Sequence, residues 1–271
     1  MTPSRSRRSR STLHTPGEEG EVNSDMATQN DAAGVSRNSA EIPRVRVFDV
    51  DDIADALDQL AVGRGRPVLV LVGGASGMSD AHRDALRSVL RWSALPLLDR
   101  LGGAVVDGGT DSGVMQVVGQ AREDARARFP LVGVAAEGTV NVPGAVANPG
   151  AADLEPHHTH FMLVPGTEWG DESPWLADIA GALAGSARSV TLVVNGGEIT
   201  FTDVNASLAR GRPVLVLEGT GRTADAIARA RRQLDEDPRA AAIAASDLTS
   251  VVAIDDDNGI RRALESALAR S

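Results

Sequence analysis

From residue 44 onward, short apolar runs rich in β-branched residues alternate with stretches whose apolar residues recur at helical spacing. Continuous apolar runs of this length are typical of buried parallel strands. The predicted strands are Val45–Phe48, Val68–Val72, Ala104–Asp107, Leu131–Ala136, Phe161–Val164, Val190–Asn195, Val214–Glu218 and Val251–Ile254. Ile53, Leu57 and Leu60 recur at i, i+4 and i+7, as on one face of a helix. The other predicted helices are Ala81–Trp92, Val114–Arg128, Leu176–Ala187, Val204–Arg210, Ala224–Leu234 and Ile260–Ala269.

This alternation predicts an α/β domain of the Rossmann-like, doubly wound type, with a mostly parallel sheet and helices on both faces. We expect one domain, residues 43–271, with 137–159 as its main irregular segment. Residues 1–42 contain almost no apolar residues to bury and are predicted to be a disordered tail. No apolar stretch behind the basic start resembles a secretory signal, and no run approaches the roughly 18 residues of a membrane span. We therefore expect a cytoplasmic protein without membrane contact.

One octapeptide, RGRPVLVL, occurs twice, at Arg64–Leu71 and at Arg210–Leu217. Each copy is followed by a glycine-rich turn and then by a helical pattern. We interpret the copies as two similar strand–turn–helix units rather than as a duplication.

Glycine-rich segments directly follow four of the predicted strands. The carboxyl ends of parallel strands meet at one edge of an open sheet, where ligands bind. Glycines let backbone amides approach an anion, and the following helix N-terminus adds positive partial charge. The four turns therefore predict a site for a phosphate-bearing ligand. Its predicted binding residues are Gly73, Gly74, Ser76, Gly77 and Met78; Asp107, Gly108, Gly109, Thr110, Asp111 and Gly113; Asn195, Gly196, Gly197, Glu198 and Thr200; and Glu218, Gly219, Thr220, Gly221 and Arg222.

The segment 157–172 adds further candidates for the ligand site, namely His160, Gly166, Glu168 and Trp169. Trp169 is interpreted either as a wall for a base or as a surface residue. Three histidines fall within residues 157–160 without a carboxylate at the spacing of known metal sites. We therefore predict no metal, and we expect one histidine to orient a loop or ligand while the others are exposed.

Composition narrows the chemistry of this site. All 27 basic residues other than histidine are arginine, and cysteine is absent. Lysine-based phosphate binding, Schiff bases, thiol nucleophiles and thiolate metal sites are therefore excluded. Aromatic residues make up only 3%, too few for stacking platforms on single-stranded nucleic acid. Any catalysis falls to carboxylates, His, Ser, Thr or Arg.

The net charge of −10 lies entirely in residues 41–271, because residues 1–40 contain five arginines and five acidic residues. Such a surface repels nucleic-acid backbones, so non-specific nucleic-acid binding is not expected. A single small phosphate ligand, held by backbone amides, helix N-termini and Arg222, fits this charge better.

Six ordered motifs carry a family resemblance: GGASGM, DGGTDSGVM, PLVGVAAEG, HHTHFMLVPGTEWGDE, LVVNGGEITFTDV and RPVLVLEGTGRTAD. Together, from Pro67 to Ala230, they resemble the prokaryotic relatives of the N-terminal domain of melastatin-type transient receptor potential (TRPM) channels. This LSDAT family belongs to the SLOG group of Rossmann-like domains, which also includes Smf/DprA and the LOG phosphoribohydrolases. The resemblance implies a bacterial domain that binds a nucleotide or an NAD-derived ligand such as ADP-ribose.

In the LOG branch, a similar crevice hydrolyses the N-glycosidic bond of a nucleoside monophosphate. Its signature PGGxGTxxE resembles Asn195–Asp203, where both glycines and Thr200 match and Asp203 stands in place of Glu. Asn195 replaces the proline, and Ile199 replaces the third glycine. The LOG motif GGGxxGLM resembles Gly108–Met115, with Thr110 in place of a glycine.

Three hypotheses follow. The first is a binding or sensor domain for a nucleotide or NAD-derived ligand, with no other cofactor. The second is a hydrolase of N-glycosidic or phosphate-anhydride bonds, with Asp203 or Glu198 as the catalytic carboxylate. The third is a structural or partner-binding module, which an oligomer whose size does not change with nucleotide would favour. The partners considered are a small nucleotide ligand and, in a homo-oligomer, further copies of the chain.

Overall fold

The computed structural model describes residues 42–75, 77–234 and 237–269, all of which belong to one compact unit. Residues 1–42 were predicted to be a disordered tail, and all of them except Ile42 lie outside the described residues. Ile42 is only 7% exposed and packs with Phe161 and Leu163.

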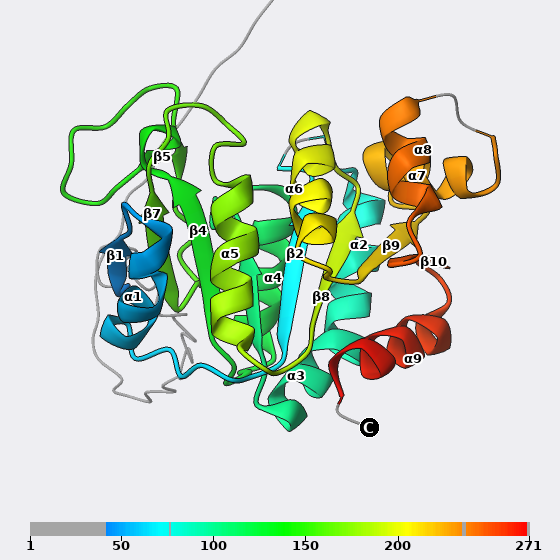
Figure 1. Cartoon of the computed structure of the whole chain (residues 1–271), viewed down its shortest axis with the longest axis horizontal. Helices are drawn as coiled ribbons and strands as arrows, with labels where there is room; N and C mark the ends of the chain where they lie inside the picture. Colours follow the sequence, from blue (N-terminus) through cyan, green and yellow to red (C-terminus); the bar gives the residue numbers. More distant parts are fainter. Residues whose placement is uncertain (1–41, 76, 235–236, 270–271) are drawn as a thin grey trace, which may run out of the picture. The chain divides into compact units, whose positions relative to one another are not determined.

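Eight parallel strands form a single sheet in the order β1-β7-β4-β3-β2-β8-β9-β10 (Figure 1). The strands are β1 Arg44–Arg46, β2 Val68–Gly73, β3 Ala104–Asp107, β4 Leu131–Ala136, β7 His160–Val164, β8 Ser189–Val194, β9 Val214–Glu218 and β10 Thr249–Ala253. A separate parallel pair, β5 Val140–Asn141 and β6 Ala152–Asp153, lies in the segment predicted to be irregular. The predicted doubly wound sheet is confirmed.

The order of the strands reverses between β2 and β8. The chain adds β3, β4 and β7 on one side of β2, then crosses back to place β8, β9 and β10 on the other side. Such a reversal opens a crevice at the carboxyl ends of the two strands. The two RGRPVLVL copies contribute β2 and β9, which pair with opposite edges of β8.

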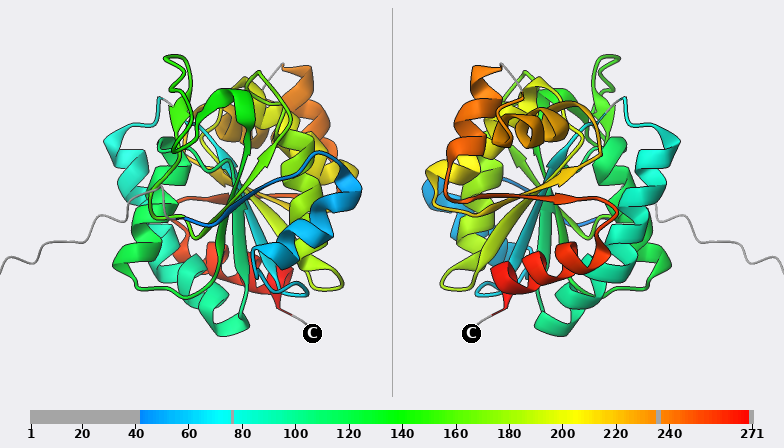
Figure 2. Two further views of the ribbon diagram at one scale, coloured as in Figure 1. Left: turned by 90° about the vertical axis from the view of Figure 1, so that its left-hand side faces the viewer. Right: turned by 90° about the vertical axis from the view of Figure 1, so that its right-hand side faces the viewer.

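Helices cover both faces of the sheet (Figure 2). One face packs against α1 Ile53–Gln59, α5 Ser173–Ala184, α6 Glu198–Ala209, α7 Arg222–Arg231 and α8 Pro238–Ala245. The other packs against α2 Asp80–Val89, α3 Leu95–Leu101, α4 Gly113–Asp124 and α9 Asp257–Leu268. A π-helical turn, Leu90–Ala94, joins α2 to α3, and short 3-10 turns occupy Val50–Asp52 and Glu137–Thr139.

The elements differ from the prediction mainly at their ends. β1 stops at Arg46, and Phe48, placed in the predicted strand, is 69% exposed. α6 begins at Glu198 instead of Val204, because Gly197 already serves as its N-cap. The helices α3 and α8 were not predicted. The shift of α6 matters most, since it places Glu198, Thr200 and Asp203 on a helix at the strand ends.

Candidate functional site

A cavity of about 260 Å³ lies at the carboxyl ends of the central strands. Its lining comes from the residues that follow β2, β3, β4 and β8, and from the first turns of α4, α5, α6 and α7. The lining residues are Leu71, Val72, Gly73, Gly74, Ala75, Gly108, Thr110, Met115, Ala135, Thr139, Trp169, Glu172, Leu176, Gly197, Glu198, Ile199, Thr200, Asp203 and Arg222. The cavity therefore lies at the point where the strand order reverses.

Two glycines let the elements around the cavity approach closely. A Cβ on Gly73 would lie 2.0 Å from the Val194 carbonyl oxygen, and one on Gly113 would lie 1.8 Å from that of Gly74. Gly113 also has a positive φ of 53°. Any side chain at either position would push β8 or α4 away from the turn after β2.

Gly108 has a different role. A Cβ there would meet only the Met115 sulfur, at 4.0 Å, and no positive φ demands a glycine. Its missing side chain leaves space in the cavity itself.

Arg222 joins the glycine turns on either side of the crevice. A Cβ on Gly77 would lie 3.1 Å from Nη1 of Arg222, and one on Gly197 would lie 3.1 Å from its Nη2. The guanidinium therefore lies against the turn after β2 and the turn after β8. Arg222 opens α7 with φ of 52°, so this helix N-terminus and the charge reach the cavity together.

Hydrogen bonds fix the turn at the start of α6. The Gly197 amide donates to Thr200 Oγ1 at 3.1 Å, and Thr223 Oγ1 donates to the Gly197 carbonyl at 3.0 Å. The Asn195 amide donates to Thr220 Oγ1 at 2.8 Å, while its Nδ2 donates to the Thr220 carbonyl at 2.7 Å. Asn195 and Thr220 are fully buried, so they hold the two turns together from below.

Two carboxylates of the cavity, Glu172 and Asp203, lie at the start of α5 and within α6. Burial is the main cause that raises the pKa of Asp203 to about 7, and the charge of Glu172 also raises it. The Ser173 hydroxyl, which donates to Asp203 Oδ1 at 2.5 Å, lowers this pKa but does not offset burial. Burial also raises the pKa of Glu172, although the Gly170 amide donates to its Oε2 at 3.0 Å. Both carboxyl groups are therefore more readily protonated than exposed ones.

The loop before α5 positions Trp169 and Glu172. The amides of Thr167 and Glu168 donate to Asp171 Oδ2 at 2.9 and 3.0 Å. With the loop held by these two hydrogen bonds, Glu172 lines the cavity, and Trp169, which is 46% exposed, lies at the cavity border.

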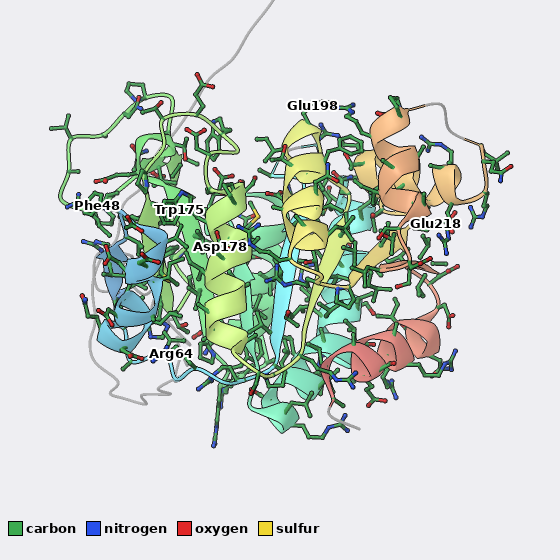
Figure 3. All side chains as sticks on the ribbon, viewed as in Figure 1. Phe48, Arg64, Trp175, Asp178, Glu198 and Glu218 are labelled. Atoms are coloured by element: carbon green, nitrogen blue, oxygen red, sulfur yellow. The ribbon has the colours of Figure 1, made fainter. Side chains whose placement is uncertain are left out.

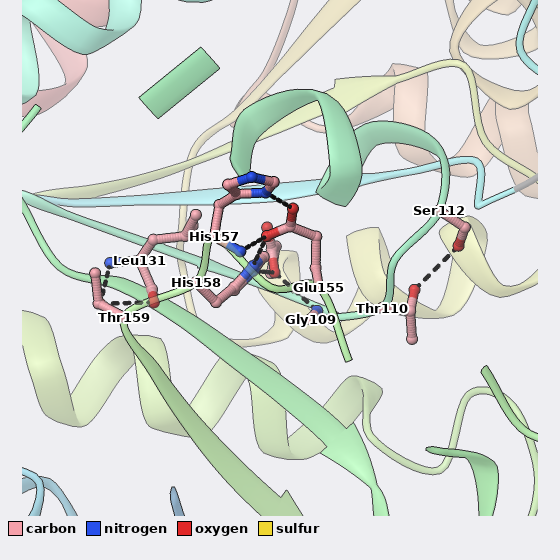
Figure 4. Close-up of polar contacts among 9 residues, drawn as sticks. Gly109, Thr110, Ser112, Leu131, Glu155, His157, His158 and Thr159 are labelled. Atoms are coloured by element: carbon pink, nitrogen blue, oxygen red, sulfur yellow. Dashed lines mark hydrogen bonds and ion pairs between the residues drawn. The ribbon is translucent and has the colours of Figure 1, made fainter. Parts of the chain in front are cut away.

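Beneath the turn after β3 lies a fully buried ionic cluster (Figure 4). His158 bonds Asp107 Oδ1 through Nε2 at 2.8 Å and Glu155 Oε2 through Nδ1 at 2.7 Å. Asp107 Oδ1 also accepts the Gly109 amide at 2.8 Å. The cluster therefore fixes the backbone that leads to the cavity wall at Gly108.

The cluster is a cation held between two carboxylates. Burial lowers the pKa of His158, but the charges and hydrogen bonds of Asp107 and Glu155 outweigh burial and raise it to about 9. Burial likewise opposes ionisation of Glu155, yet His158 and His157 lower the pKa of this carboxyl. The expectation that one of the three histidines is held in place and the others are exposed is wrong, because His158 is fully buried and His157 is bonded to Glu155 with its side chain only 31% exposed. No group of three or more His, Asp or Glu in the described ranges has the geometry to hold a metal ion.

The structure brings ten of the predicted site residues to the cavity, including both catalytic candidates, Asp203 and Glu198. They are Gly73, Gly74, Gly108, Thr110, Trp169, Gly197, Glu198, Thr200, Asp203 and Arg222. Glu198 borders the cavity, but its carboxylate pairs with Arg239 and its side chain is 81% exposed at the start of α6 (Figure 3).

Other predicted residues lie close by without lining the cavity. Met78, Asp107, Asn195 and Thr220 are buried beneath the turns, and Gly77, Gly109, Gly113, Gly166, Gly196, Gly219 and Gly221 shape the backbone around them. Ser76 lies outside the described residues.

Four predicted residues point elsewhere. His160 begins β7 and so lies at the opposite edge of the sheet, where its Nδ1 bonds Thr159 Oγ1. Glu218 pairs with Arg232, away from the cavity (Figure 3). Asp111 accepts a hydrogen bond from Gln116 at 3.0 Å, and Glu168 is exposed on its loop.

Sequence reasoning missed the lining residues Thr139 and Ala135, and it did not single out Glu172 from the other two carboxylates of its loop. Thr139 and Ala135 belong to the end of β4 and the turn that follows, a fifth strand end without the dense glycines of the other four. Glu172 stands in a loop whose sequence shows carboxylates but not which of them turns inward.

Fold and site together define a Rossmann-like, doubly wound domain with a glycine-lined cavity at its switch point. The chain belongs to the prokaryotic LSDAT family: the family model described as "SLOG in TRPM, prokaryote" matches residues 66–262. The predicted resemblance is thereby confirmed.

Individual relatives agree with this assignment. The chain is 26% identical over 201 residues to transient receptor potential cation channel subfamily M member 2 of Rattus norvegicus, and 26% identical over 197 residues to the Mus musculus protein of that name. It is 28% identical over 198 residues to the member-like 2 channel of Nematostella vectensis. Each match covers 59% of this chain but only 13% of the channel.

Among solved structures, the X-ray structure of TM1055, a structural genomics target, is similar to 74% of this chain. The match covers 99% of that chain at 20% identity, with a TM-score of 0.46. Within the described part of this chain, no helix is long and apolar enough to cross a membrane.

Proposed function

We propose that the cavity binds a nucleotide or an NAD-derived ligand, and that the chain works as a ligand-binding or sensor domain. The observation that carries this proposal is the position of Arg222, whose guanidinium lies against two glycine turns where α6 and α7 begin. Backbone amides, two helix N-termini and a guanidinium form a suitable site for a phosphate. Apolar residues such as Leu71, Met115 and Leu176 supply the remaining walls.

The volume of the cavity limits what enters it. Small-molecule sites usually measure about 300–1,000 Å³, and this cavity measures about 260 Å³. We therefore expect one phosphate–ribose–base unit inside. In a larger ligand such as ADP-ribose, the second half would extend past Trp169.

Thermal unfolding and calorimetric titration with AMP, GMP, NAD, ADP-ribose and cyclic ADP-ribose test this proposal. A ligand at one hundred times its Kd stabilises the folded state by about 2.7 kcal/mol. We expect at least one of these compounds to raise the Tm by roughly 5–10 °C, as that energy implies for a domain of this size. Absence of any response across the panel would contradict the proposal.

A second candidate function is hydrolysis of an N-glycosidic or phosphate-anhydride bond. It is favoured by Asp203, a carboxyl that lies in the cavity with its pKa raised to about 7, in the range suited to general acid–base catalysis. Asp203 serves this role better than Glu198, because Arg239 already engages the Glu198 carboxylate.

Incubation with NAD and nucleoside monophosphates, followed by product chromatography, tests hydrolysis. We expect Asp203→Asn to abolish turnover and Glu198→Gln to reduce it much less. The double variant Glu123→Gln/Asp124→Asn is a matched control, because both residues are exposed at the end of α4. Turnover that is absent from the wild type, or that survives loss of both Asp203 and Glu198 carboxylates, would exclude this candidate.

A further inference from the structure

The cavity contains two carboxylates, Glu172 and Asp203, that form no ion pair with any basic residue that the structure describes. The groups that shift the pKa of Asp203 are Ser173, which lowers it, and Glu172, which raises it together with burial. For Glu172, burial and Asp171 raise the pKa and backbone amides lower it. Within the described part of the chain, no arginine acts on either carboxylate. Glu198, by contrast, pairs with Arg239 on the outer side of α6.

Asp203 is also incompletely satisfied. It is only 8% exposed and lines the cavity, yet among the described residues only the Ser173 hydroxyl donates to it, at Oδ1. Its Oδ2 receives no hydrogen bond from those residues. Buried carboxylates are normally paired or hydrogen-bonded, because an isolated charge in a protein interior costs several kcal/mol. Asp203, buried in the cavity wall beside the half-buried Glu172, therefore points to a ligand group that completes its hydrogen bonding.

The remaining polar groups of the cavity have the opposite character. Arg222 and the N-termini of α6 and α7 attract an anion beside Gly197, whereas Glu172 and Asp203 lie where α5 packs on α6. A ligand that satisfies both ends has a phosphate at one end and a positive charge at the other. Because the cavity has space for one nucleotide unit, with the phosphate at one end, the positive charge at the other end belongs to the base.

We propose that Glu172 and Asp203 form a cation-binding wall, so that the preferred ligand of the cavity is a ribonucleotide whose base carries a positive charge, as in pyridinium mononucleotides. This inference rests on the proposed nucleotide-binding function and specifies its ligand class. Carboxylates also bind neutral ribose hydroxyls, so the decisive comparison keeps the ribose and changes only the charge of the base.

Nicotinamide mononucleotide and its reduced dihydropyridine form provide that comparison, because they share phosphate and ribose and differ in the base charge. We expect calorimetry at pH 7 to give at least about tenfold tighter binding of the oxidised form, the ratio that corresponds to about 1.4 kcal/mol. In Glu172→Gln/Asp203→Asn, the two forms should bind within about twofold of each other. The matched variant Glu123→Gln/Asp124→Asn, which removes one Glu and one Asp charge from an exposed helix end, should keep the wild-type ratio.

Proton exchange gives a second readout. A cation beside Asp203 favours its ionised form, so binding of the oxidised mononucleotide at pH 7 should release protons. The binding enthalpy should then vary with the ionisation enthalpy of the buffer more strongly than for the reduced form, which shares the phosphate and lacks the cation.

The possible failures are separable. If the reduced form or AMP binds the wild type as tightly as the oxidised form, the cation-binding wall is wrong and the nucleotide site stands. If the oxidised form keeps its advantage in Glu172→Gln/Asp203→Asn, the carboxylates are not its cause and the inference is overturned. If no nucleotide binds at all, the proposed function fails together with the inference.

Discussion

Two pairs of carboxylates lie at the same edge of the sheet, and they differ in how they are satisfied: Asp107, Glu155 and Asp203 are buried, and Glu172 is half-buried. Asp107 and Glu155 enclose His158, and the pKa of Glu155 falls despite burial. Glu172 and Asp203 have no such cation among the residues that the structure describes, and their pKa values rise. The first pair is a closed structural cluster, whereas the second remains open to the cavity. Their difference separates residues that build the site from residues available to a ligand.

The largest expected effect comes from removing the cation of the closed cluster. His158→Gln leaves Asp107 and Glu155 buried without their partner, which typically destabilises a protein by about 3–5 kcal/mol. Urea unfolding at pH 7 measures this loss. His157→Gln is the control, since that histidine contacts the same Glu155 from a partly exposed position and should cost about 1 kcal/mol or less. Equal costs for the two variants would show that the cluster has no special role.

A smaller effect is expected at Gly119, where α4 packs on the closed cluster. A Cβ there would lie 2.2 Å from Glu155 Oε2. Replacing glycine by alanine within a helix normally stabilises by about 0.5–1 kcal/mol. Gly119→Ala should instead destabilise by about 1–3 kcal/mol, because the methyl group overpacks the cluster. Gly181→Ala in α5, whose Cβ would meet only Arg212 Nη2 at 3.9 Å, should show the normal gain in the same unfolding measurement.

The pH dependence of stability distinguishes the two pairs. The raised pKa of Asp203 favours folding in its protonated form, so this contribution is present below pH 4 and is lost as pH rises to about 7. The raised pKa of His158 contributes fully below pH 6.5, and that contribution is lost as pH rises through about 9. Melting curves should therefore show declining stability over both ranges.

Single variants assign each range to its group. Asp203→Asn should flatten the decline between pH 4 and 7 and raise stability at pH 8 by up to about 4 kcal/mol, because each unit of the pKa shift from 3.8 to about 7 corresponds to about 1.4 kcal/mol. His158→Gln should flatten only the decline above pH 6.5. If the pH dependence of stability is the same in Asp203→Asn as in the wild type, Asp203 does not have the raised pKa that distinguishes the pair Glu172 and Asp203.

The sheet was largely predictable, because continuous apolar runs define buried parallel strands. Ala104–Asp107, Leu131–Ala136 and Val214–Glu218 match the observed strands residue for residue. The start of α6 was not predictable, since Gly196 and Gly197 read as the beginning of a longer loop. The alanine-rich helix α8, Pro238–Ala245, offered little apolar contrast to reveal its period.

The site was predictable only in outline. Strand-end glycines indicated the correct edge of the sheet. Only the structure shows that Gly73 is needed for close contact with β8, whereas Gly108 leaves space in the cavity. Asp107 was expected to meet the ligand and is instead bonded to His158, 51 residues away in sequence. No local pattern reports a pairing over that separation.

The most direct test of whether this cavity binds a nucleotide is to fill the cavity with a side chain. A valine at position 108 meets no close neighbour at Cβ and projects into the cavity, so Gly108→Val should fold normally and exclude the ligand. Gly150→Val is the matched control, at an exposed glycine whose Cβ would meet only Asn148 Oδ1 at 3.8 Å. Calorimetry with the tightest nucleotide should show at least about tenfold weaker binding to Gly108→Val, a loss of about 1.4 kcal/mol or more, and wild-type binding to Gly150→Val. Undiminished binding to a folded Gly108→Val protein would contradict the assignment of this cavity.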